Sequence, residues 1–462
     1  MSLDDVIALQ VAREPRQALD HLNTLRRQEP DNLDYQAAEA ALLLDLHHFD
    51  AAAACAISVL RQQPNRLDAL NSLAVALVET NRLDEAATVF RHSFRLAPND
   101  ARVVANYGNF LSYRGDHELA IAAFDAAVSL SPLDNEMGVL QAMALLRAGH
   151  FAKGWGAFER RKRRPDPVER DGISPLPMLT GADTPDLSGR TILLAHEQGF
   201  GDSLQMLRYV PLLARRGARV LLRMPPALMR LAATVEGVTA VLAEGESPVE
   251  DGTRIDSFAP MMSLPRLFGT DLGNLPAEIP YIHPRENDRA RWQSLLAPLP
   301  RPRIGLVWAG APRGGLDRRR SLRFAQIEPL MQERGSFINL QIGPANADWH
   351  LPESATGLDP TCELGDFYET AALVAELDLV ISVDTSTAHL AGALGTPVWL
   401  IDRFDACWRW LTDRTDSPWY PRHRLFRQPS PGDWPSAIAA IAQALRRGEI
   451  SPNNREQAAR SS

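Results

Sequence analysis

The sequence predicts an α/α helical repeat solenoid followed by an α/β region of two doubly wound parallel-sheet halves. A proline recurs every 34 residues over the first third of the 462-residue chain, which indicates stacked helical pairs. From residue 190 onward, short apolar strands alternate with helices, as in parallel sheets. We expect the repeat array at 1–164, a linker at 165–189, α/β halves at 190–300 and 301–450, and a disordered tail at 451–462.

The composition is that of a globular protein, and it argues against several classes of function. The formal net charge of −8 argues against broad binding of nucleic acid. Cys55, Cys362 and Cys407 lie far apart and form no CxxC pair, so they predict neither a disulfide framework nor a zinc site. The sequence has no signal-peptide pattern and no apolar run of ~18 residues that would span a membrane, so we expect a cytoplasmic protein.

The repeat array is indicated by two residue types that recur in register. Its prolines are Pro30, Pro64, Pro98 and Pro132, and twelve residues before each stands an alanine, namely Ala18, Ala52, Ala86 and Ala120. The alanines mark where two helices of a pair approach closely, and the prolines end each second helix. This pattern resembles the tetratricopeptide repeat, which implies a concave surface that binds a peptide or a partner protein. A rigid stalk and a dimerisation face are the alternatives.

The α/β region begins with a buried strand at 191–195, and its later strands are expected at 219–223, 239–244 and near Ile255. The second half begins with a strand at 303–310, and further strands are expected at 337–342, 377–383 and 398–401. Ligands of doubly wound proteins bind in the crevice outside the carboxyl ends of the strands. Three polar motifs directly follow predicted strands, so all three can face one crevice.

The first motif is the turn from Gln198 to Ser203, with the sequence QGFGDS. Gly199 and Gly201 allow a tight turn and close approach of the backbone to a ligand. Asp202 is a candidate general base for an acceptor hydroxyl, and Glu197 is the second candidate. An N-cap role would equally explain an aspartate at a helix start. The GxGxxG spacing of a dinucleotide site is absent.

The second motif runs from Trp308 to Ser321 and contains Gly310 and four arginines, namely Arg313, Arg318, Arg319 and Arg320. Guanidinium groups bind phosphate oxygens bidentately and neutralise charge on a departing nucleotide. We therefore expect a phosphate contact from Arg319 or Arg320, with no basis for choosing between them. A solvated surface loop is the alternative.

The third motif follows the strand at 377–383 and begins a helix of small residues. It consists of Asp384, Thr385, Ser386 and Thr387, with His389 one turn into the helix. The first N–H groups of a helix lack internal partners and carry partial positive charge, so they attract an anion. The alternatives are an ordinary strand–helix unit with a polar cap and a packing role for His389.

The stretch from Cys407 to Tyr420 is unusually aromatic. We expect Trp408 and Trp410 either to stack on the base or sugar of a ligand or simply to cover the crevice.

Together these motifs resemble the GT-B glycosyltransferases related to the lipopolysaccharide heptosyltransferases. That family carries a Gly-x-Gly-Asp turn and an Asp-Thr-x-x-x-His-x-x-x-Ala motif, which here are Gly199 to Asp202 and Asp384 to Ala393. The order of repeats and motifs is similar, over nearly the whole chain, to bacterial repeat-containing glycosyltransferases and, in architecture, to O-GlcNAc transferase.

The resemblance implies a metal-independent, inverting transfer of sugar from a nucleotide-diphosphate donor, with no cofactor besides this substrate. By this resemblance Asp202 is the base, and the motif that begins at Asp384 holds the diphosphate. Arg319 or Arg320 stands where heptosyltransferases have a lysine, and that lysine is absent here. The repeats would recruit an acceptor protein, peptide or glycan.

Two other functions fit the same sequence. One is a scaffold or binding protein whose GT-B part has lost its chemistry. The other is a nucleotide-sugar epimerase, which fits less well because it would not need the repeat array.

Overall fold

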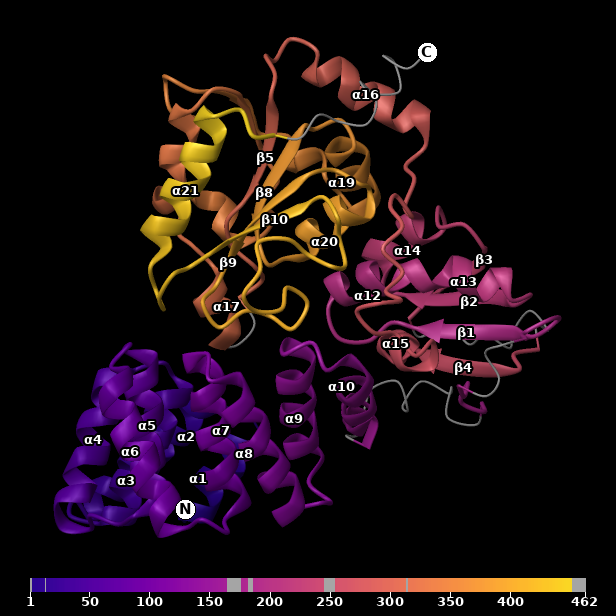
Figure 1. The fold of residues 1–462 in the computed structure, drawn as a ribbon. Coiled ribbons are helices and arrows are strands. Elements are labelled where there is room, and N and C mark those ends of the chain that lie inside the picture. Colours follow the sequence, from indigo (N-terminus) through magenta and orange to yellow (C-terminus); the bar gives the residue numbers. More distant parts are fainter. Residues whose placement is uncertain are drawn as a thin grey trace. The chain divides into compact units, whose positions relative to one another are not determined.

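The computed structural model describes residues 2–12, 14–163, 176–181, 186–244, 254–312 and 315–450 (Figure 1). The chain divides into two compact units, Met1–Ala144 and Leu145–Ser462. The tail expected at 451–462 and Arg313 lie outside the described residues.

The first unit is an array of antiparallel helices, as the proline period predicted. The helices are α1 (Leu3–Val11), α2 (Pro15–Gln28), α3 (Leu33–Asp45), α4 (Phe49–Gln62), α5 (Leu67–Glu79), α6 (Leu83–Leu96), α7 (Ala101–Arg114), α8 (His117–Leu130) and α9 (Asn135–Arg147). Each repeat proline comes two residues after the end of α2, α4, α6 or α8. All four repeat alanines are fully buried, which confirms that they lie where helices pack.

The pair α7 and α8 shows why small residues are needed inside a repeat. A Cβ on Gly108 in α7 would lie 3.1 Å from the ring of Phe124 in α8, so the two helices meet at the glycine. Asp100 caps the start of α7 through its side chain, and Gly115 ends the helix in a left-handed conformation with φ of 89°.

The second unit begins before the α/β strands, with α10 (Phe151–Phe158) and the 3₁₀ turn η1 (Glu159–Arg163). Trp155 packs edge to face against Trp408, with the ring centres 5.1 Å apart. This helix packs on the α/β region. The compact units divide at Ala144, within α9, whereas the repeat pattern is expected to run to residue 164.

Part of the linker expected at 165–189 is described, at 176–181 and 186–189. Met178 forms a parallel bridge with Phe258, and Leu179 and Leu187 are buried. These described residues pack as an extension of the first sheet rather than as a free connection.

The N-terminal half contains a parallel sheet of order β3-β2-β1-β4. Its strands are β1 (Thr191–Ala195), β2 (Arg219–Met224), β3 (Val238–Ala243) and β4 (Ser257–Pro260). The helices of this half are α12 (Phe200–Met206), α13 (Val210–Arg215), α14 (Pro226–Ala232) and α15 (Leu264–Leu267). Every residue of β1 is buried, because helices cover both faces of a doubly wound sheet.

The C-terminal half contains a parallel sheet of order β10-β9-β8-β5-β6-β7. Its strands are β5 (Arg303–Val307), β6 (Ser336–Asn339), β7 (Thr356–Leu358), β8 (Leu379–Val383), β9 (Val398–Asp402) and β10 (His423–Arg427). The helices are α16 (Glu286–Leu296), α17 (Gly315–Arg320), α18 (Phe324–Ile327), α19 (Phe367–Val374), α20 (Ser386–Ala393) and α21 (Trp434–Arg446). The two parallel sheets confirm the predicted fold class, although the sequence analysis missed β7 and β10.

The core of the C-terminal half joins the sheet to α21. Ile304 and Leu306 of β5 and Ile381 of β8 are buried together with Ile438 and Ile441 of α21. Within the described ranges, no helix combines the length and apolar character needed to cross a membrane.

Candidate active site

Each sheet has one point at which the strand order reverses. In the N-terminal sheet this point lies between β1 and β4, and in the C-terminal sheet it lies between β5 and β8. Ligands of doubly wound proteins bind outside the carboxyl ends of the strands at such points. The turn that contains Asp202 leaves β1 and the motif that begins at Asp384 leaves β8, so both motifs stand where a ligand is expected.

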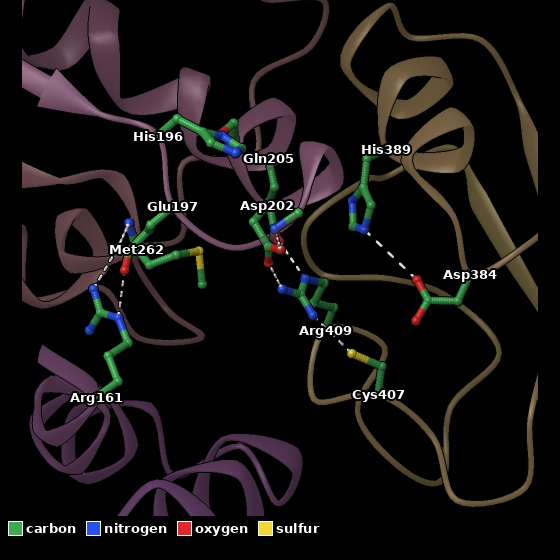
Figure 2. Close-up of polar contacts among 12 residues, drawn as sticks. Arg161, His196, Glu197, Asp202, Gln205, Met262, Asp384, His389, Cys407 and Arg409 are labelled. Carbon is green, nitrogen blue, oxygen red and sulfur yellow. Dashed lines mark hydrogen bonds and ion pairs between the residues drawn. The ribbon is translucent and has the colours of Figure 1, made fainter. Parts of the chain in front are cut away.

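The two motifs face one another across the two halves (Figure 2). Gly201 in α12 packs against His389 in α20, and a Cβ on Gly201 would lie only 2.7 Å from His389 Cδ2. Gln198, in the turn before α12, has a positive φ of 65°, which is uncommon for a residue with a side chain. The structure thus brings together the first and third motifs of the sequence.

Asp202 lies in the first turn of α12 and is engaged on both carboxylate oxygens. Its Oδ2 accepts a hydrogen bond of 2.9 Å from the backbone N–H of Gly199. Its Oδ1 accepts a hydrogen bond from Arg409 of the C-terminal half, and the two side chains form an ion pair. The N-cap residue of α12 is Gly199, so Asp202 is the third helical residue and caps the helix start from there instead of being the N-cap itself. It also stands at the junction of the halves.

Glu197, the second candidate base, is a structural residue in this fold. Its side chain is 5% exposed, and its two oxygens accept hydrogen bonds of 2.7 and 3.0 Å from Arg161. Its Oε1 also accepts the backbone N–H of Met262, which follows β4 (Figure 2). Burial alone would lower the pKa of Arg161, but hydrogen bonding and attraction from Glu197 outweigh it and raise this pKa. The geometry does not support a catalytic role for Glu197.

The helix α20 begins at the motif of the C-terminal sheet. Thr385 is its N-cap residue, with an extended backbone, and makes no side-chain hydrogen bond to the first turn within the described chain. Its Oγ1 lies 3.0 Å from Ser382 Oγ instead. Ser386 and Thr387 are half-buried. The N–H groups and hydroxyls of the first turn of α20 are the groups that an anion at this helix start would use.

His389 lies one turn into α20 and is almost fully buried. Its Nδ1 lies 3.0 Å from Tyr420 Oη and its Nε2 lies 3.8 Å from Asp384 Oδ1. Burial, reinforced by the positive charge of Arg409 and other neighbours, lowers the pKa of His389 well below its ordinary value. The imidazole is thus neutral at neutral pH, and it packs the junction while it positions its polar neighbours.

The arginines of the second motif take different positions. Arg320 donates a hydrogen bond of 2.9 Å from Nη1 to the backbone carbonyl of Asp384, at the end of β8. Arg319 lies 3.5 Å from Asp405, further along the C-terminal half. Gly310 lies beside both Asp317 and Arg320, since a Cβ there would lie 2.5 Å from Arg320 Nη2. Of the two candidates, Arg320 stands at the carboxyl end of β8 and Arg319 is turned to another partner.

Arg409 was missed as a site residue by the sequence analysis. Its Nε donates to Gln205 Oε1 at 3.0 Å and its Nη1 to Cys407 Sγ at 3.0 Å, while Nη2 holds Asp202. Burial disfavours its charge, but the carboxylate of Asp202 outweighs this effect and raises the pKa of Arg409. It is a permanently charged group at the junction, contributed by a loop rather than by a motif after a strand.

The aromatic stretch has a packing role in the structure. Trp408 is 3% exposed and Trp410 is fully buried. Trp410 stacks on His389 and on His423, with ring centres 5.2 and 5.6 Å away. Neither tryptophan offers an exposed face for a base or sugar, so the alternative that they cover the crevice fits better than ligand stacking.

Further contacts hold the two halves together. Phe200 packs edge to face on Phe367, with the ring centres 5.3 Å apart. Arg208 is buried and donates to the carbonyl oxygens of Pro276 and Trp419 at 2.9 and 2.8 Å. Arg208 thereby ties the N-terminal half to the crossover segment (residues 268–285, between α15 and α16) and to the C-terminal half.

A surface hollow of about 330 Å³ lies elsewhere, along the crossover segment. Its polar lining includes Arg208, Arg215, Glu236, Glu278 and His283. The junction itself is filled by side chains: those of Asp202, Arg409 and His389 are 14%, 13% and 5% exposed. Chemistry at the junction would therefore require Arg409 or the halves to move.

A metal ion has no evident site in the parts of the chain that the structure describes. They contain no group of three or more His, Cys, Asp or Glu side chains able to hold one.

Comparison with known proteins agrees with this architecture. The tetratricopeptide repeat family matches residues 37–101 and 108–167, and glycosyltransferase family 9 (heptosyltransferase) matches residues 302–400. The second match covers Gly310, Arg320 and the motif of α20. The chain therefore combines tetratricopeptide repeats with a heptosyltransferase-like unit, which confirms the resemblance seen in the sequence.

Among individual proteins, Protein FlbA of Caulobacter vibrioides is 29% identical over 385 residues. The match covers 77% of this chain and 63% of FlbA, so the chain spans less than two thirds of that relative. A thermophilic tetratricopeptide protein of Thermus thermophilus has a TM-score of 0.34 at 18% identity, covering 36% of this chain and 92% of its own. MamA of Desulfovibrio magneticus, from residue 41 onward, has a TM-score of 0.30 at 20% identity, covering 35% and 94%.

Proposed function

We propose that this protein is a glycosyltransferase that moves a sugar from a nucleotide-diphosphate donor to a hydroxyl group of a protein or glycan. The observation that carries the proposal is the junction itself. Asp202, after β1, pairs with Arg409 of the C-terminal half, and its neighbour Gly201 packs against His389 of α20, after β8. Both motifs stand at the reversal points of the two parallel sheets. The match of residues 302–400 to glycosyltransferase family 9 supports the same reaction class.

In the proposed reaction, Asp202 takes the proton of the acceptor hydroxyl. The hydroxyl oxygen forms a bond to the anomeric carbon from the face opposite the diphosphate. The bond from this carbon to the diphosphate oxygen breaks, and its electron pair leaves with the diphosphate. This single displacement inverts the anomeric carbon, and it needs a base on one side of the sugar and positive charge on the other.

The C-terminal half supplies the positive side in this proposal. The N–H groups and hydroxyls at Thr385, Ser386 and Thr387 would hold the diphosphate. Arg320, which donates to the carbonyl of Asp384, would add a permanent charge beside them. These groups would stabilise the leaving diphosphate without a metal ion.

The repeats would recruit the acceptor. Their array of helical pairs is a fold that commonly binds peptides and partner proteins along its concave surface. The acceptor is therefore proposed to be a protein, a peptide or a glycan carried by one.

The test is a screen of mass-tagged nucleotide sugars for hydrolysis or transfer by the purified full chain, followed by D202N. A positioned general base contributes typically 10²–10⁴-fold, so the variant should lose at least about 100-fold in turnover. D416N is the matched control, because Asp416 is exposed and pairs with its near neighbour Arg414. Full turnover in D202N would show that Asp202 is not the base.

A scaffold without chemistry is the second candidate, because Asp202 is fully engaged by Gly199 and Arg409. This engagement would suffice if the carboxylate served only to join the halves. A scaffold would turn over no nucleotide sugar in the screen.

A further inference from the structure

Arg409 can donate more and stronger hydrogen bonds than it makes to its present partners. A guanidinium group has five N–H donors in a fixed plane. One donates to Asp202, one to the amide oxygen of Gln205, and one to the sulfur of Cys407, which is a weak acceptor. Replacing the sulfur by a stronger acceptor, such as an anionic oxygen, would strengthen the hydrogen bonding of this buried guanidinium.

Several charged side chains surround Arg409 and His389. Arg208 and Arg320 act with it on His389, whereas the carboxylates nearby are Asp202 and Asp384. His389 is itself neutral. Arg320 is also paired with Asp317 at 3.2 Å. Of the arginines around His389, Arg409 is thus the one held by the candidate base Asp202.

Gln205 supplies an independent sign that an acceptor belongs here. Its side chain is fully buried, and its amide Nε2 has no hydrogen-bond partner among the described residues. Its other end, Oε1, accepts from Arg409 Nε. A buried donor without a partner is costly, and an anionic oxygen brought to Arg409 would also come close to this amide.

We propose that Arg409 is a ligand of the donor's diphosphate and that Asp202 competes with the diphosphate for it. Before the donor binds, Arg409 pairs with Asp202 and blocks its carboxylate. When the diphosphate takes Arg409, Asp202 is released to accept the proton of the acceptor hydroxyl. Donor binding is thus coupled to exposure of the base, and the donor binds first. This inference rests on the proposed function, since it requires that the site takes a nucleotide diphosphate.

The competition predicts that two variants, R409Q and D202N, change the affinity for the diphosphate in opposite directions. R409Q removes a charge-assisted contact to the diphosphate and should weaken its binding about tenfold or more. D202N removes the competitor and leaves Arg409 in place, so it should tighten binding by a similar factor. A purely structural ion pair predicts the same sign for both variants, because each breaks the same contact.

The experiment is isothermal titration of the full chain with ADP, GDP, UDP, CDP and dTDP, followed by R409Q and D202N with the tightest of these. R414Q is the control, since Arg414 lies in the same loop and pairs with Asp416. Changes of opposite sign in R409Q and D202N, with R414Q like the wild type, support the proposal.

Weaker binding in both variants, or no change in either, overturns the proposal while the proposed function stands. Failure of the wild-type chain to bind any of the five diphosphates overturns the proposed function and this inference together. Urea midpoints of all variants, read by tryptophan fluorescence, identify a variant that has lost its fold. In that case R409K, which keeps the charge but loses the planar fork, replaces R409Q and should still weaken binding.

Discussion

Replacing Gly201 by alanine tests the contact on which the junction depends. The added Cβ would lie 2.7 Å from His389 Cδ2, whereas ordinary van der Waals contact begins at 3.4 Å. The ring of His389 has little room to move away, because it is hydrogen-bonded to Tyr420 at 3.0 Å and stacks on Trp410. Either the ring or the two helices must move by roughly 0.7 Å to relieve the overlap.

The expected change in the unfolding free energy of G201A is the sum of two opposing effects. Overpacking of a filled site costs typically 1–3 kcal/mol, whereas alanine in place of glycine inside a helix gains about 1 kcal/mol. G201A should therefore lose about 1 kcal/mol of unfolding free energy. G156A is the matched control, because Gly156 lies in α10 and an added Cβ there meets nothing within 4 Å. It should gain about 1 kcal/mol, which leaves a difference of about 2 kcal/mol between the variants.

Urea unfolding followed by tryptophan fluorescence is the suitable assay, because all nine tryptophans lie in the second unit. The double variant G201A/H389A separates the overlap from other effects. Removing the imidazole should abolish the penalty of the added methyl group, measured relative to H389A alone. The reasoning is refuted if G201A is as stable as G156A, or if the penalty persists in the H389A background.

Three further variants test other parts of the structure. E197Q removes one of the two carboxylates that pair with the buried Arg161, the other being Glu159, and should cost up to about 3 kcal/mol of unfolding free energy by the same urea assay. Burial lowers the pKa of His423 to about 3, so the unfolded imidazole gains its proton near pH 6.5 and the folded one only near pH 3. Stability should therefore fall by about 2 kcal/mol from pH 7 to pH 5 through this group, and H423F should lack this component in paired urea titrations. A120L places a large side chain at a fully buried position of α8 and should cost about 2 kcal/mol, measured by the far-ultraviolet dichroism of the repeats.

The fold was predictable because its signals are local and periodic. The 34-residue period located α2, α4, α6 and α8, and apolar runs located the central strands of both sheets. The missed strands are at the edges of the C-terminal sheet. β7 has only three residues, and in β10 two apolar residues stand between Arg424 and Arg427, so neither strand forms an apolar run. Edge strands are more exposed to solvent than central strands, so their sequences contain fewer consecutive apolar residues.

The candidate site was predictable only where its residues follow a strand. Asp202 and Asp384 were predicted because each stands directly after a buried strand and before a helix. Arg409 lies in a long loop, and 207 residues separate it from Asp202. No local pattern encodes a pairing over that distance. The pair of Arg161 and Glu197 was likewise not predictable from a local pattern. The sequence predicted Glu197 as a second candidate base, whereas its partner Arg161 lies at the end of the repeat region.

The helix α10 explains why the expected boundary at residue 164 does not divide this chain physically. On one side, the turn that follows α10 places Arg161 on Glu197, next to the strand that leads to Asp202. On the other, Trp155 packs on Trp408, the neighbour of Arg409. One short helical segment therefore contacts both halves, close to the two side chains that join them. Cutting the chain at residue 164 would expose these rings and leave Glu197 buried without its cation, so the α/β region requires the last helix of the repeat pattern as part of its own core.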